Sequence, residues 1–343
     1  MYSYRLSHLE HLTTHIGIHE HALLSEPRPE HGYCTDDNAR LAIVMSREPD
    51  EGAAHRMMRT ALAFVLDSQA DSGLVRNRFM LDGYWRWVDS PRAEDAWGRA
   101  LWALGTVAAA HPNPGFRAMA RWGFERSARQ RSPWRRSMTF AALGAADLLG
   151  AEPEHHLAHR LLVDAVMAIL PPGHPDGVWP EERLTYANAA LPEALIAAGA
   201  VLDAPVVLAR GLGMLDWLLR RQIRDGHLSV VGAGGAPLLD GGPRFDQQPI
   251  EVAALADACW RAWTVTGDRR WEQGLILAGD WFLGANDTGV PMVDPVTGGG
   301  YDGLEPDGVN LNQGAESTLA LVSTMQRASS VWSLRPLAAQ GRR

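Results

Sequence analysis

Six segments of the chain are apolar on nearly all sides and rich in Ala, Leu and Gly, and they can be written beneath one another as repeats. Their first residues lie 41 to 65 positions apart, a spacing that suits one helical hairpin with loops of variable length. A helix that is apolar on all sides is buried on most of them, so the six segments predict an inner set of helices. They begin at Arg40, Arg99, Phe140, Glu193, Glu251 and Glu316.

Segments of a second kind separate these repeats and carry apolar residues three or four positions apart, with charges between them. They span residues 53–68, 116–129, 155–170, 205–221 and 269–284, and residues 1–25 are expected to supply one more. Buried helices that alternate with amphipathic ones indicate two concentric rings. We therefore predict one all-α domain over residues 1–343, an (α/α)6 toroid of six helical hairpins, with short β-hairpins only near 75–88 and 228–239.

Composition narrows the class of ligand. A net charge of −8 and a pI near 5.9 argue against nucleic acid or an anionic membrane as the main partner and favour a neutral ligand. The amino-terminal segment lacks a signal-peptide pattern, and no apolar stretch of about 18 residues occurs, so we expect a cytoplasmic protein. Cys34 and Cys259 lie far apart and are expected to be reduced thiols. No cofactor is predicted, and the oligomeric state is left open.

The starts of the inner helices carry most of the polar signal. In an (α/α)6 barrel these starts meet at one end, where free backbone N–H groups and helix dipoles stabilise carboxylates. In the first two helices an Asp stands four residues before an Arg, which indicates either a helix cap with an ion pair or an acid that is free for chemistry. The residues are Asp36, Asp37 and Arg40 in the first helix and Glu94, Asp95 and Arg99 in the second.

The last two inner helices share a Gln and a Glu three residues apart, Gln248 with Glu251 and Gln313 with Glu316. Glu193 falls at the aligned position of the fourth helix. Three carboxylates at equal depth would repel one another unless they were protonated, paired with the arginines or bound to a ligand. Either a ring of salt bridges closes the barrel, or two of the carboxylates act as general acid and general base.

Two long loops that lead into the last two inner helices add further polar side chains, and long irregular loops of this kind often line sites. Their glycines lack the spacing of a dinucleotide or phosphate-binding loop, and their acids lack the order of an EF-hand calcium loop. The candidate substrate-binding residues in them are Asp246, Gln247, Tyr301, Asp302 and Asn312.

Aromatic and histidine residues supply the remaining candidates. Several of the thirteen tryptophans stand between helices, where a Trp either packs in the core or covers a flat apolar surface such as a sugar ring. Trp85, Trp87 and Trp179 are the candidates for sugar stacking. His31, beside Tyr33, stands just before the first inner helix and is expected to reach the cleft. The other amino-terminal histidines lack the HExxH pattern, so no metal site is predicted.

Residues 31–40, 246–251 and 312–318 resemble a group of bacterial proteins often labelled glycosyltransferase or glycosidase-like, which are similar to the six-hairpin glycosidase superfamily. The likeness runs over nearly the whole chain. It implies the toroid and a saccharide ligand, whereas the glycosyltransferase label conflicts with the absence of a Rossmann-like nucleotide-sugar half.

These observations predict a glycoside hydrolase that acts on an oligosaccharide. One carboxylic acid would protonate the leaving oxygen and another carboxylate would activate water, with inversion if the two are about 6.5 to 9.5 Å apart. The candidates are Asp37, Asp95, Glu251 and Glu316.

Three alternatives remain at this point. A glycoside phosphorylase would place phosphate near Arg40 or Arg99. A sugar 2-epimerase would need two histidines at inner-helix starts, drawn from His31, His174 and His227. A non-catalytic saccharide-binding protein would use the same cleft without turnover.

Overall fold

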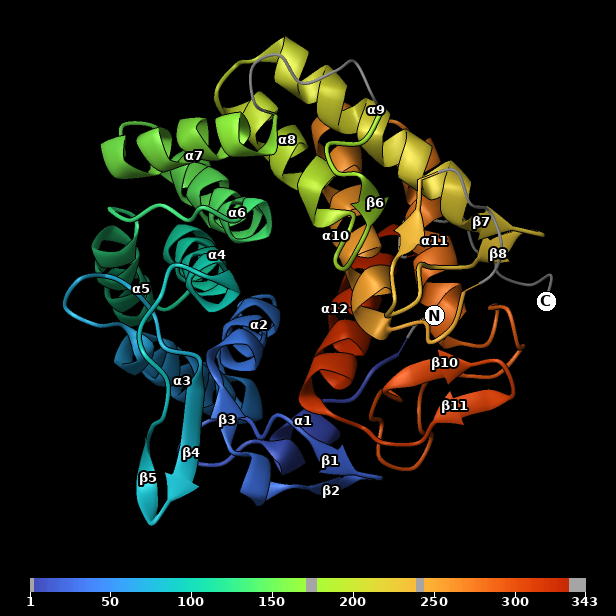
Figure 1. Cartoon of the computed structure of the whole chain (residues 1–343), viewed down its shortest axis with the longest axis horizontal. Coiled ribbons are helices and arrows are strands. Elements are labelled where there is room, and N and C mark those ends of the chain that lie inside the picture. Colours follow the sequence, from blue (N-terminus) through green and yellow to red (C-terminus); the bar gives the residue numbers. More distant parts are fainter. Residues whose placement is uncertain (1–2, 171–177, 239–243, 333–343) are drawn as a thin grey trace.

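Twelve α-helices form two concentric rings in the computed structural model, which describes residues 3–170, 178–238 and 244–332 (Figure 1). The inner ring consists of α2 (Thr35–Met45), α4 (Asp95–Ala110), α6 (Arg135–Ala151), α8 (Ala190–Val201), α10 (Pro249–Thr266) and α12 (Ala315–Trp332). The outer ring consists of α1 (Ser7–Leu12), α3 (Gly52–Ser68), α5 (Pro114–Ser127), α7 (His156–Ile169), α9 (Pro205–Gln222) and α11 (Arg270–Phe282). Each inner helix packs against the next, and α12 returns to α2, so the ring closes. The predicted (α/α)6 barrel is confirmed.

The sequence pattern explains the two rings. Every residue of α8 from Ala190 to Gly199 is buried, because an inner helix has neighbours on all sides. The outer helix α7 buries only the apolar residues that recur at three- and four-residue steps and leaves the charged face to solvent. The segment 1–25 supplies only the short helix α1, which packs against α12, and the rest of it is loop and strand.

Glycines let two inner helices approach very closely. A Cβ atom built on Gly144 of α6 would lie 2.7 Å from both the carbonyl carbon of Leu101 and the Cα of Trp102 in α4, and closer still to the Leu101 carbonyl oxygen. Gly105 of α4 meets the backbone of Gly144 in the same way. The backbones of α4 and α6 are therefore in direct contact, and only residues without a side chain fit between them.

Short antiparallel strands lie on the rim of the barrel. The predicted hairpin near 75–88 is confirmed as β4 with β5, but residues 228–239 do not form one hairpin, because β8 pairs with β7 and β9 pairs with β6. The strands are β1 (Ala22–Leu23), β2 (Glu26–Pro27), β3 (Tyr33–Cys34), β4 (Arg78–Asp82), β5 (Tyr84–Trp87), β6 (Arg183–Leu184), β7 (Ile223–Arg224), β8 (His227–Leu228), β9 (Ala236–Pro237), β10 (Gly303–Glu305) and β11 (Gly308–Asn310). None of the helices in the described part of the chain is long and apolar enough to cross a membrane.

A layer of buried ion pairs crosses the barrel near its middle, and we call it the floor. Asp257 accepts from Arg47 at 2.9 Å, from Arg327 at 2.7 Å and from the Ser323 hydroxyl at 3.2 Å. Asp257 stands eight residues after the first residue of α10, which places it about 12 Å along that helix. The neighbouring guanidinium cations outweigh burial, so the pKa of the Asp257 carboxyl is below its usual value.

Candidate active site

The starts of the inner helices surround one cleft, as predicted. A cavity of about 340 Å³ lies over the starts of α2 and α12. A second cavity, of about 260 Å³, lies beside it over the start of α4. The two cavities share the side chains of Asp36, Arg40, Gln248 and Glu316, so we treat them as one cleft.

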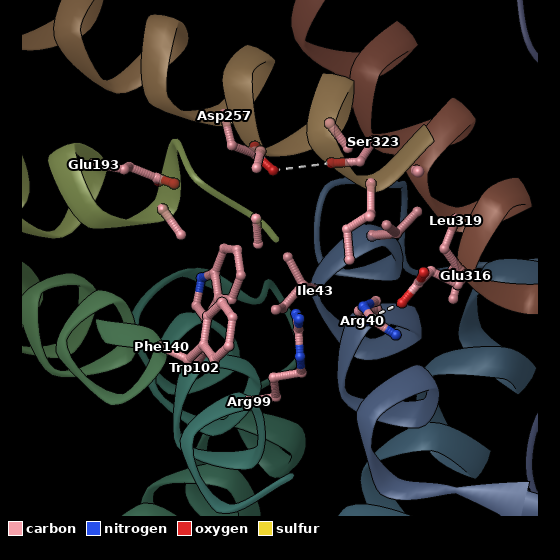
Figure 2. Close-up of a pocket in the computed structure, with 17 residues that line it drawn as sticks. Arg40, Ile43, Arg99, Trp102, Phe140, Glu193, Asp257, Glu316, Leu319 and Ser323 are labelled. Atoms are coloured by element: carbon pink, nitrogen blue, oxygen red, sulfur yellow. Dashed lines mark hydrogen bonds and ion pairs between the residues drawn. The ribbon is translucent and has the colours of Figure 1, made fainter. Parts of the chain in front are cut away.

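Arg40 lies at the centre of this cleft and joins two helices. One terminal nitrogen of its guanidinium is 2.5 Å from Oδ1 of Asp37, and the other is 2.6 Å from Oε2 of Glu316. The Asp37 side chain is 3 % exposed, whereas that of Glu316 is 41 % exposed (Figure 2 shows Arg40 and Glu316). The two carboxylates therefore share a cation but differ sharply in their access to solvent.

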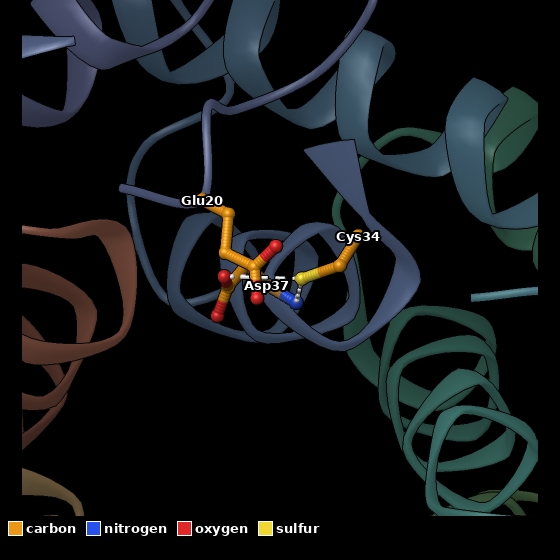
Figure 3. A group of neighbouring side chains, drawn as sticks. All are labelled: Glu20, Cys34 and Asp37. Carbon is orange, nitrogen blue, oxygen red and sulfur yellow. Dashed lines mark hydrogen bonds between the residues drawn. The ribbon is translucent and has the colours of Figure 1, made fainter. Parts of the chain in front are cut away.

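Burial raises the pKa of Asp37 to about 6, an increase that Glu316 and Glu20 reinforce and that Arg40 opposes. Figure 3 shows Asp37 beside Glu20 and Cys34, whose thiol donates to Asp37 at 3.1 Å. The metal-ligating atoms of the three residues lie within 4.8 Å of one another. However, Arg78 binds Glu20, and burial keeps the pKa of the Cys34 thiol high, so Cys34 is a thiol that caps α2 rather than a thiolate ligand.

The expected i,i+4 ion pairs are replaced by others: Arg40 pairs with Asp37 at i,i+3 within α2, and both arginines also pair with a neighbouring helix. Arg40 binds Glu316 of α12, and Arg99 lies 3.4 Å from Asp36 of α2, with its guanidinium 3.9 Å above the ring centre of Phe140. Neither Asp caps its helix, since Cys34 and Glu94 hold the N-cap positions.

Asp95 also lies in the cleft, where it accepts from Ser137 at 2.8 Å and from the hydroxyl of Tyr186. Tyr186 lines the cleft and was not among the predicted residues. It stands in the segment before α8, beside Thr185 and Asn188. These polar neighbours are the only signal for Tyr186 that the sequence offers. Glu94 is exposed and pairs with Arg92 outside the cleft.

The carboxylates of the fourth and fifth helices do not lie at the depth of Glu316, so that expectation is wrong. Glu251 is buried and accepts from the backbone N–H groups of Ala187 and Asn188 and from the Asn188 side chain at 2.8 Å. Its carboxylate holds the segment before α8. Glu193 lies far deeper, 3.5 Å from Arg261, because α8 begins further down the barrel than α10.

Most of the predicted Gln and Asn side chains support the rim. Gln313 binds Asp294 at 2.9 Å and Thr297 at 2.6 Å, and Gln247 binds Asp287 at 2.5 Å. Asn312 accepts from the backbone of the loop between β1 and β2. Among the predicted amides, Gln248 is the one that lines the cleft in the described part of the chain.

The loop residues Asp246 and Asp302 complete the acidic half of the cleft, and burial raises the pKa of both carboxyls. Tyr301 lies beside them, and its hydroxyl binds Asp294. Glu20 and His21 also line this half and were not predicted, because nothing in the local sequence distinguishes them from the other residues before α2.

The predicted aromatic residues are divided between rim and core. Trp85 packs 5.2 Å from Tyr33 on the β4–β5 hairpin, and the Trp87 indole N–H donates to Asp67 at 2.9 Å. Trp179 is 3 % exposed and packs 5.5 Å from Trp217, so it offers no face to a sugar. That expectation is wrong because another aromatic ring covers it.

Two of the three candidate histidines for epimerisation, His31 and His227, lie in the described part of the chain. His31 contacts the ring of His21 edge-on at 5.0 Å, and His21 lines the cleft. His227 pairs with Asp287 on the rim at 3.1 Å. His174 lies outside the described residues.

The fold is similar to those of several solved carbohydrate-processing enzymes. The cellobiose 2-epimerase from Bacillus thermoamylovorans superposes with a TM-score of 0.71, at 11 % identity over 96 % of both chains. A D-mannose isomerase gives 0.64 at 10 % identity over 96 % of both chains. A cellulase of C. cellulolyticum gives 0.60 at 8 % identity over 93 % of this chain and 88 % of its own. At these identities the similarity shows the fold alone. No family model and no curated protein sequence matches the chain.

Proposed function

We propose that the protein is a carbohydrate-active enzyme, and specifically a glycoside hydrolase that acts on an oligosaccharide bound in the cleft. One observation carries this proposal: Asp37 and Glu316 bind opposite nitrogens of Arg40 but lie in different environments. A pair of carboxyl groups with different environments supplies one acid and one base at the same pH.

In this proposal Asp37 is the general acid and Glu316 is the general base. The raised pKa of Asp37, about 6, keeps part of it protonated near neutral pH. Its proton passes to the glycosidic oxygen as the bond from that oxygen to C1 breaks. Glu316, which faces solvent, takes a proton from the water that bonds to C1 from the opposite face. Arg40 then stabilises the Asp37 carboxylate that the transfer leaves behind.

Hydrolysis is favoured over phosphorolysis because the cleft offers little to an anion. Both terminal nitrogens of Arg40 are bound to carboxylates, and Arg99 lies between Asp36 and the Phe140 ring. A phosphate ion would have to displace one of these carboxylates and would meet the remaining acids of the cleft.

A sugar 2-epimerase is the second candidate, because His21 lines the cleft and contacts His31. Moving a proton from one face of C2 to the other is simplest with a base on each face. Two rings in edge contact lie on the same wall, and this arrangement ranks epimerisation below hydrolysis.

Proton NMR of the products tests the proposal. The wild type is incubated with α- and β-linked oligosaccharides, with and without phosphate, beside Asp37→Asn, Asp95→Asn and Glu316→Gln. Asp164→Asn on the outer helix α7 is the matched control, since its carboxylate is exposed and pairs with Arg131 away from the cleft. We expect a sugar of one anomeric form, the same rate without phosphate, and losses of at least 100-fold in Asp37→Asn and Glu316→Gln.

Each of the other possible results would indicate a different function. Cleavage that requires phosphate would indicate a phosphorylase. A change at C2 of a reducing sugar without cleavage would indicate the epimerase, and binding without any chemical change would indicate a saccharide-binding protein. Cleavage that survives both Asp37→Asn and Glu316→Gln would refute the assignment of acid and base.

A further inference from the structure

The axis of the barrel is hollow below the cleft. A cavity of about 60 Å³, which we call the lumen, is lined by side chains from all six inner helices (Figure 2). Arg40, Arg99 and Glu316 line both the lumen and the cleft, so the lumen adjoins the proposed active site.

The walls of the lumen are apolar. On one side the rings of Trp102 and Phe140 lie parallel, 6.1 Å apart, and on the other side lie the side chains of Ile43 and Leu319. Several wall positions carry only a methyl group, and one of them, Ala254, keeps partial exposure although it stands inside an inner helix. The alanines of the wall are Ala187, Ala190, Ala253, Ala254 and Ala320.

Among the carboxylates that line the lumen in the described part of the chain, Glu193 has an oxygen without a partner. The Glu193 side chain is 2 % exposed and lines the lumen, and its Oε2 has no hydrogen-bond partner among the described residues. Its other oxygen lies 3.5 Å from Arg261. Asp257, at the same level, has partners on both oxygens, so Glu193 is the acid of the lumen that a ligand can satisfy.

The charges around Glu193 decide its protonation state. Burial and the carboxylates of Asp257 and Asp147 raise its pKa to about 8, whereas the cations Arg261 and Arg327 oppose the increase, and the thiol of Cys259 lies nearby. The raised pKa favours the carboxylic acid form of Glu193, which can donate a hydrogen bond.

We propose that the lumen binds a short, uncharged, mainly apolar group of the ligand, with an oxygen that accepts a hydrogen bond from Glu193. The volume of the lumen exceeds that needed for one water, so it has room for a group of a few non-hydrogen atoms. The inference rests on the proposed function only in assigning this group to a saccharide bound above it.

Saturation-transfer NMR with acetone tests the proposal without any turnover. Acetone is small and apolar and carries one acceptor oxygen, and acetate is the charged comparison. We expect saturation transfer from wild type to acetone and none to acetate. Ala320→Leu fills the lumen and should reduce the transfer at least threefold, and Ala254→Val is the milder version if Ala320→Leu does not fold. Ala118→Leu, on the exposed face of α5, is the matched control and should leave the transfer unchanged.

The pH dependence identifies Glu193 as the donor. Transfer to acetone should fall in wild type as the pH rises through about 8, because the carboxylate that forms cannot donate. In Glu193→Gln the amide still donates, so the transfer should persist above that pH. Equal transfer in wild type and a folded lumen-filling variant, or no transfer in wild type, would overturn the proposal. Because acetone is not a substrate, neither result bears on the hydrolase assignment, which the product NMR tests separately.

Discussion

Replacement of Gly144 by Ala tests whether the contact between α4 and α6 sets the stability of the barrel. The added methyl group would lie 2.7 Å from backbone atoms of Leu101 and Trp102, and closer to the Leu101 carbonyl oxygen. These atoms belong to the backbone of a buried helix, so no side chain can rotate away. The two inner helices must move apart, and their other contacts loosen with them.

Two effects of opposite sign determine the magnitude. An Ala in a helix interior is favoured over Gly by about 1 kcal/mol. Overpacking costs about 1 to 3 kcal/mol, and a backbone contact belongs at the upper end of that range. The expected net loss is therefore about 2 kcal/mol. An unfolding entropy of about 2.1 cal/mol/K per residue, over 343 residues, converts this loss to a Tm about 3 °C lower.

The assay is thermal unfolding followed by circular dichroism, with Gly213→Ala as the matched control. Gly213 lies within α9, and a Cβ atom there would meet nothing within 4 Å. The control should gain up to about 1 kcal/mol from helix propensity alone. If Gly144→Ala were as stable as wild type while Gly213→Ala gained stability, the backbone contact would not limit the packing of α4 on α6.

Three further predictions concern the polar groups. Asp37 has a folded pKa of about 6 against 3.8 for the free group, so the folded state binds its proton more tightly and this contribution is lost as the pH rises from 4 to 6. Relative to Asp37→Asn, wild type should lose about 2 kcal/mol of unfolding free energy between pH 4 and 7 in denaturant titrations. Glu251→Gln turns an N–H toward the N–H of Ala187 and should lower the unfolding free energy by about 1 to 3 kcal/mol; an unchanged midpoint would contradict the role of Glu251 in holding the segment before α8. Tyr186→Phe removes a hydroxyl that lines the cleft and binds Asp95, and we expect kcat/KM to fall about tenfold with stability retained; an unchanged value would show that the Tyr186 hydroxyl does not contribute to the reaction.

The fold was predictable because the sequence of each inner helix indicates that the helix is buried on most sides. A segment such as residues 190–199, without a polar face, can only lie inside a larger assembly, and six such segments leave few arrangements. The rim was harder to predict. β8 pairs with β7 just before it, but β9 pairs with the distant strand β6, so local alternation over residues 228–239 gave the wrong hairpin.

The cleft was predictable in position and less so in detail. Asp37 and Glu316 were found from their places at helix starts, but the partner of Arg40 on α12 lies 276 positions away in the sequence. Glu193 was misplaced because alignment of repeats assumes that every inner helix begins at the same height. Trp179 was misassigned because a sequence cannot show that Trp217 covers it.

The barrel contains two charged layers, and the difference between them separates structure from function. At the floor, Asp257 has a cation or hydroxyl partner for each oxygen and a lowered pKa, as expected of a group that holds helices together. At the cleft, Asp37 has a raised pKa and Glu316 faces solvent beside a cavity. Replacing a buried ion pair by apolar residues is often neutral or stabilising, so closing the ring does not require a second layer. The floor already joins α10 and α12 to the segment that follows α2, through Arg47, Asp257 and Arg327. Stability alone therefore gives little reason to keep Arg40 and its two carboxylates at the helix starts, whereas the proposed ligand of the cleft would give one.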